Sequence, residues 1–195
     1  PPTSTLFPYT TLFRSVDYFQ LPEEQLPALV RRVQISNIGT GGLSIELVDG
    51  LPRIIPHGMD RKALHVTPRH SEGLMKVYGL RGVPLYRLKI DPEDKPEIEL
   101  LPGSNFYLTF APCRGGLLHD YLVDPRALFG GCESLARPVV FLEGGLEAVR
   151  RMPQVRENRT PAAFTAFGAA LGRGETLLFY SDRKSTRLNS SHVSQ

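Results

Sequence analysis

The sequence has no tryptophan, only two cysteines, and no apolar run approaching the roughly 20 residues that a helix needs to cross a bilayer. The missing tryptophans remove the aromatic side chain on which sugars most often stack, which argues against a complete sugar-processing site in this chain. Cys113 and Cys132 are 19 positions apart and form no CxxC pair, and the alternative to free thiols is a disulfide between them. We expect two reduced thiols and a cytoplasmic chain, because no secretory signal indicates an oxidising compartment.

Neither end of the chain shows the apolar periodicity of a strand or of a helix. Residues 5–15 are TLFPYTTLFRS and residues 182–192 are DRKSTRLNSSH. Each segment matches the translation of a DNA sequencing adapter, residue for residue. We therefore expect residues 1–15 and 182–195 to be adapter-derived, and we base no fold prediction on them. Residues 16–181 are then expected to be a fragment of a longer gene product.

The formal charge of +3 comes from these two ends. Arg14 contributes one positive charge and residues 182–195 contribute a net charge of two, so residues 16–181 are neutral. They contain no stripe of Lys and Arg interleaved with aromatic residues, the pattern typical of nucleic-acid binding. We expect one domain that binds neither nucleic acid nor membrane.

Short segments with apolar side chains at every second position recur between Gly- and Pro-rich turns. In LSIELVDG, for example, Leu43, Ile45 and Leu47 share one face. The other segments are VQISN (33–37), YRLKI (86–90), EIELL (97–101), FYLTF (106–110), AAFTAF (162–167) and ETLLFY (175–180). This spacing predicts a mostly β chain, an antiparallel β-sandwich or barrel. Because ETLLFY ends without a closing turn, we expect the sheet to be incomplete at its C-terminal end.

Helix signals are few. Residues 21–32 contain Pro22 and Pro27, and the second proline would interrupt a helix. The segment DPRALFGG predicts a single helical turn with Asp124 as its N-cap. The segment GTGG (39–42) lies between two predicted strands and not before a helix, so we interpret it as a hairpin turn and not as a phosphate-binding loop.

The residues able to carry chemistry show no catalytic or metal-binding spacing. His57, His65 and His70 are not at ligand offsets, so we expect solvated loop histidines, or histidines that face hydroxyl groups, in place of a metal site. Glu46 is expected on the solvated face of its strand. No spacing selects an acid–base pair from the candidate carboxylates, which are Asp49, Asp60, Glu72, Asp91 and Glu133.

Four collinear stretches carry a resemblance to a known family. They are residues 31–59, 82–110, 121–135 and 158–181, the first of which reads RRVQISNIGTGGLSIELVDGLPRIIPHGM. In this order they resemble the amino-terminal region of cellobiose-phosphorylase-like enzymes, glycoside hydrolase family 94. The resemblance is to the branch that acts on β-1,2-linked glucose oligomers.

The resemblance implies a galactose-mutarotase-like supersandwich, followed in the parent enzyme by an (α/α)6-barrel domain of the same chain. It implies a dimeric enzyme that cleaves a carbohydrate substrate with inorganic phosphate as co-substrate and releases glucose 1-phosphate, without a resident cofactor or metal. The catalytic aspartate and the phosphate-binding residues belong to the barrel in this family. No catalytic residue is therefore carried over to this chain, which is expected to be inactive alone.

One segment, 56–69, is the candidate for a loop that reaches the rim of the parent enzyme's active site. The candidate substrate-binding residues are His57, Asp60, His65 and Arg69 of this segment and His70, which follows it directly. The alternative is a structural crossover held by Pro52 and Pro56.

Two other functions stay open. One is a stand-alone carbohydrate-binding sandwich; the other is a mutarotase-type sugar epimerase, which would need His57, His70 and Glu72 to converge.

Overall fold

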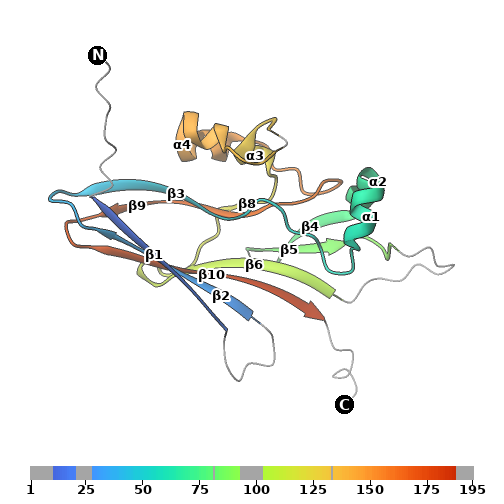
Figure 1. Cartoon of the computed structure of the whole chain (residues 1–195), viewed down its shortest axis with the longest axis horizontal. Helices are drawn as coiled ribbons and strands as arrows, with labels where there is room; N and C mark the ends of the chain where they lie inside the picture. Colours follow the sequence, from blue (N-terminus) through green and yellow to red (C-terminus); the bar gives the residue numbers. More distant parts are fainter. Residues whose placement is uncertain (1–10, 21–27, 81, 93–102, 133, 188–195) are drawn as a thin grey trace.

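The computed structural model describes residues 11–20, 28–80, 82–92, 103–132 and 134–187. Within them the chain forms two antiparallel sheets and four α-helices (Figure 1). The predicted mostly β, antiparallel character is confirmed. Neither sheet closes on itself among the described strands. Each helix in this part of the chain is too short or too polar to cross a membrane.

The larger sheet has seven described strands. Its order is β1 (Leu12–Gln20), β2 (Ala28–Asn37), β10 (Thr176–Arg187), β6 (Gly103–Ala111), β5 (Val83–Leu88) and β4 (Met75–Leu80), and β7 (Gly116–Leu117) also pairs with β6. The smaller sheet has the order β3 (Leu43–Leu51), β9 (Ala163–Leu171) and β8 (Tyr121–Leu122). A short 3-10 helix (Pro112–Arg114) connects β6 to β7.

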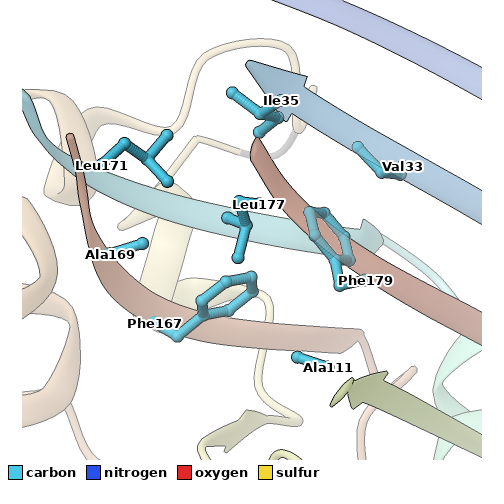
Figure 2. Close-up of a cluster of buried hydrophobic side chains, with 8 residues drawn as sticks. All are labelled: Val33, Ile35, Ala111, Phe167, Ala169, Leu171, Leu177 and Phe179. Carbon is cyan, nitrogen blue, oxygen red and sulfur yellow. The ribbon is translucent and has the colours of Figure 1, made fainter. Parts of the chain in front are cut away.

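Side chains from both sheets meet in a shared hydrophobic cluster between them. Figure 2 shows Val33 and Ile35 of β2 and Leu177 and Phe179 of β10 beside the side chains of β9. The rings of Phe167 and Phe179 pack edge to face with centroids 5.3 Å apart. These contacts follow the period of two in VQISN and ETLLFY, because alternate side chains of a strand face the same side.

The central strand of the smaller sheet, β9, is buried on both faces. Thr165 and Phe167 face the larger sheet, where the Thr165 hydroxyl lies 2.7 Å from that of Thr109. Phe164 and Ala166 face α3 (Arg126–Phe129) and α4 (Val139–Arg151), which cover the outer side of the smaller sheet (Figure 1). A strand covered on both faces needs no polar side, which is why AAFTAF shows little alternation.

The GTGG segment is not the hairpin turn that the sequence predicts. It carries the chain from β2 in the larger sheet to β3 in the smaller sheet. The buried side chain of Asn37 holds this crossing. Its Oδ1 accepts a hydrogen bond from the N–H of Gly39, and its Nδ2 donates to the carbonyl oxygens of Gly41, Leu171 and Gly172 at 2.8–3.1 Å.

The strands at both ends run into the segments expected to be adapter-derived. Residues 12–15 of β1 pair with residues 34–37, and β10 continues past Ser181 to Arg187 beside β6. Residues 12–15 and 182–187 thus belong to strands of the larger sheet. Backbone pairing needs no particular side chain, so their adapter origin stays a prediction. The predictions for residues 21–27 and 97–101 lie outside the described residues.

The structure has more helix than the sequence predicts. The turn at Asp124 is confirmed, since its Oδ1 accepts from the N–H of Arg126 at 3.0 Å. The helix α4 was missed because it contains Gly144 and Gly145, and Gly145 has a φ of 63° that kinks it. Glu46 does not face solvent alone; its carboxylate accepts from the N–H of Leu146 at 2.9 Å and caps the second half of α4.

Two further corrections concern single segments. The strand predicted at FYLTF (106–110) is longer in the structure, where β6 begins at Gly103. The strand YRLKI ends at Leu88, so that Ile90 lies beyond β5 and is exposed.

We predict that Asn37→Ala destabilises the protein by about 3 kcal/mol. The change leaves three carbonyl oxygens and one N–H without their partner at a buried position, and each such loss costs about 1–3 kcal/mol. Urea unfolding followed by circular dichroism measures this. The control is Ser36→Ala, which removes one exposed hydrogen bond to Thr176 and should cost less than about 1 kcal/mol. Similar losses for both variants would contradict the role of Asn37.

A second prediction concerns alkaline pH. Tyr86 is fully buried, and burial raises the pKa of its hydroxyl above the usual value. An unfolded tyrosine ionises near about pH 10, so deprotonation above this pH favours the unfolded chain and stability falls. Tyr86→Phe removes that contribution. It should also be no less stable at neutral pH, because the Tyr86 hydroxyl has no hydrogen-bond partner among the described residues.

Urea midpoints measured from about pH 8 to about pH 11 test this prediction. The wild-type midpoint should fall more steeply above about pH 10 than that of Tyr86→Phe. Equal slopes for the two proteins would show that Tyr86 does not carry the effect.

Candidate functional site

The predicted rim loop folds as two short helices. After a short turn, α1 (Arg61–Val66) and α2 (Pro68–Gly73) occupy most of the segment. Asp60 caps α1, because its Oδ1 accepts a hydrogen bond from the N–H of Lys62 at 3.0 Å. Pro68 stands at the start of α2, where a proline needs no N–H partner. The expectation of a loop is therefore wrong.

The five predicted substrate-binding residues have different surroundings. Asp60 caps a helix, and His57 packs against the backbone of Gly103, where a Cβ atom would collide with the imidazole ring. His65 and His70 lie at exposed positions of α1 and α2. Of the five, only Arg69 lines the cleft that lies beside these helices.

This cleft, which we call the arginine cleft, has a volume of about 640 Å³. Part of its lining comes from Arg53 and Ile55, which follow β3, and from residues of α1 and α2. Another part comes from Arg126 at the start of α3 and from the loop after that helix. Arg159 and Thr160, just before β9, complete it. A volume of this order suits a small-molecule ligand.

A buried ion pair fixes one part of the arginine cleft. The Asp124 side chain is 2% exposed, and its two carboxylate oxygens accept from Nη1 of Arg159 at 2.8 and 2.6 Å. The same carboxylate also accepts from the N–H groups of Arg126 and Val155. Asp124 thus has its acceptor sites occupied, and it holds Arg159 at the edge of the cleft instead of serving as a free acid or base.

A second carboxylate links α2 to the segment just before β9. Oε1 of Glu72 accepts from both the N–H and the hydroxyl of Thr160, at 3.1 and 2.9 Å. Of the three residues that an epimerase would need, His57, His70 and Glu72, only Glu72 lines the arginine cleft. The structure therefore does not bring the epimerase residues together there.

Positive charge dominates the lining of the arginine cleft. Among the described lining residues are four arginines and one glutamate, and Arg159 is already paired with Asp124. Arg53, Arg69 and Arg126 make no ion pair with any carboxylate in the described part of the chain. Cys132 also lines the cleft, and a hydrogen bond with Ser134 lowers the pKa of its thiol. The arrangement favours an anionic group.

The other candidate carboxylates lie elsewhere. Asp49 is buried between the sheets, where it pairs with Arg31 and accepts a 3.3 Å hydrogen bond from the Tyr107 hydroxyl. Burial, followed by the nearby Asp49 charge, raises the pKa of Tyr107. Asp91 follows β5, and Glu133 lies outside the described residues. In the described ranges, no three His, Cys, Asp or Glu side chains lie close enough to share a metal ion.

Comparison with known proteins identifies no relative, so any functional assignment depends on the residues of the chain itself. No protein-family model matches the sequence, and no curated protein is found to be similar to it.

Sequence reasoning missed most of the arginine cleft. Arg53 and Arg126 each follow a proline, and Arg159 precedes a threonine–proline pair, so all three lie at the boundaries of elements: after β3, at the start of α3 and before β9. The neighbouring prolines were the one available signal. Nothing in the linear pattern indicates that boundaries separated by up to about 100 residues meet, because their meeting depends on how the two sheets and α3 pack.

We predict that Asp124→Asn lowers the free energy of unfolding by about 3 kcal/mol, because it leaves Arg159 without its partner charge in a partly buried place. The matched control is Asp120→Asn. Asp120 pairs with Arg150 at an exposed position, where such a pair contributes less than about 1 kcal/mol. Urea unfolding of the two variants measures the difference. If Asp124→Asn is as stable as the control, the ion pair does not hold this part of the cleft.

Proposed function

We propose that this chain is a non-catalytic amino-terminal β-sandwich of a glycoside phosphorylase, of the supersandwich kind. The parent enzyme would cleave β-linked glucose oligosaccharides with inorganic phosphate and release glucose 1-phosphate. The catalytic acid and the phosphate-binding groups would come from a helical (α/α)6-barrel domain of the same polypeptide. The chain described here would support that domain, the active-site rim and a dimer in the cytoplasm.

The main support for this proposal is the position in the fold of the four stretches that resemble the phosphorylase family. Each of the four supplies residues that hold the two sheets and the helices together. Asn37 comes from the first, Tyr107 from the second, Asp124 from the third, and Arg159 and Thr165 from the fourth. A resemblance carried by such residues concerns the domain as a folded unit. It says less about substrate, which depends on a site.

Fewer residues are available for the proposed rim contact than the five that the sequence suggests. Asp60 and His57 are engaged in local structure, as a helix cap and as a packing partner of Gly103. The exposed side chains of α1 and α2, His65, Arg69 and His70, are the ones available to a substrate or to the helical domain. Val66, which is 70% exposed, adds an apolar contact point on the same helical pair.

The alternative of a stand-alone carbohydrate-binding sandwich would need aromatic rings side by side on one exposed face. The most exposed aromatic side chains of β1 are Phe13 and Tyr18. They are separated by an odd number of positions, so they point to opposite faces of the strand. These two rings of β1 therefore do not form the shared platform that this alternative needs.

The test compares this chain with its parent gene. Reading the source DNA beyond the codon for Ser181 should yield several hundred further codons with helical periodicity, and the protein they complete should release glucose 1-phosphate from β-1,2-linked glucose oligomers and phosphate. The purified chain alone should release none above the buffer blank. A stop codon within a few codons of Ser181, or glucose 1-phosphate release by the chain alone, would contradict the proposal.

A further inference from the structure

The described residues of the arginine cleft carry more positive than negative charge. Arg53, Arg69 and Arg126 line it without a carboxylate partner in the described ranges, while Glu72 is held by Thr160. Like charges that share a cleft repel one another, and the protein walls focus their field into the opening. An anion bound there would relieve this repulsion, whereas a neutral ligand would not.

Hydrogen bonds join the segments that form the walls of the cleft. Asp124 fixes Arg159 through two hydrogen bonds, and Glu72 ties α2 to Thr160. The backbone adds a further link, because the N–H of Ile54 donates to the carbonyl oxygen of Pro161 at 2.8 Å. Arg53 and Arg69 are therefore carried by segments that are both anchored at residues 160–161.

The chemistry of the lining restricts the ligand further. Guanidinium groups present paired N–H donors that match the oxygens of phosphate and carboxylate groups. Ile55, Leu64 and Leu135 supply apolar surface beside them. Several arginines suit an anion with more than one charge, and about 640 Å³ suits a small molecule.

We propose that the arginine cleft is a binding site for a small multivalent anion that carries phosphate or carboxylate groups. Arg69 and Arg126 contact the ligand, and the Asp124–Arg159 pair positions the wall of the site. This inference does not rest on the phosphorylase assignment, since it follows from the charge and geometry of the cleft alone.

The experiment is calorimetric titration of the whole chain at low ionic strength with two probes, pyrophosphate for phosphate groups and citrate for carboxylates. Binding of at least one probe is expected, and it should weaken as salt is added. The probe that binds more tightly assigns the ligand class. If neither probe binds, the proposal is wrong.

Matched variants locate the binding. The double variant Arg69→Ala/Arg126→Ala should weaken binding at least about tenfold, because two charge-assisted contacts are lost. Arg173→Ala removes an exposed arginine in the β9–β10 turn and should leave binding unchanged. Arg69→Lys/Arg126→Lys retains both charges and should fall between the two. A double alanine variant that unfolds at the wild-type urea midpoint and binds like wild type would overturn the proposal.

The two cysteines provide a readout that needs no substitution. Cys132 lines the arginine cleft, and Cys113 is an exposed thiol outside it. A bound probe should slow alkylation of Cys132 by iodoacetamide, measured by mass spectrometry, and leave the rate at Cys113 unchanged. Calorimetric binding that slows neither thiol would place the anion elsewhere and contradict the site.

Discussion

The rest of the structure depends on the burial of β9 between two layers. One face of this strand packs against β2, β6 and β10 of the larger sheet, and the other packs against α3 and α4. Its small side chains, including Ala163 and Ala166, are fully buried and let the layers approach closely. Burial of a single phenylalanine contributes about 1.5–3 kcal/mol, and β9 buries two of them, Phe164 and Phe167.

The position of the arginine cleft follows from the same strand. Thr160 lies just before β9 and is fastened to α2 through Glu72, while Arg159 beside it is fastened to Asp124 before α3. The start of β9 thus connects the helical pair α1–α2 on one side with α3 on the other. A polar network at the end of a doubly buried strand determines how these helices meet, and hence which arginines share a cleft.

Part of this arrangement is readable from the sequence. The period of two in VQISN and LSIELVDG predicted β2 and β3, and the DPRALFGG signature predicted the single turn of α3 with its capping aspartate. The helices α1, α2 and α4 were missed because their signals are short or are broken by Pro68 and by Gly144–Gly145. Of the five predicted site residues, Arg69 is the one that lines the arginine cleft.

The sequence by itself determined the local choices: which segments are extended, which side chains share a strand face, and where Asp124 starts a helical turn. Each of these depends on neighbours within a few residues, which a linear pattern records. Only the tertiary structure decided that the GTGG segment crosses between sheets and that Arg53, Arg69, Arg126 and Arg159 surround one cleft. Those placements depend on packing between segments that are distant in the chain. Strand period and turn chemistry are local patterns, and they do not specify which distant segments contact each other.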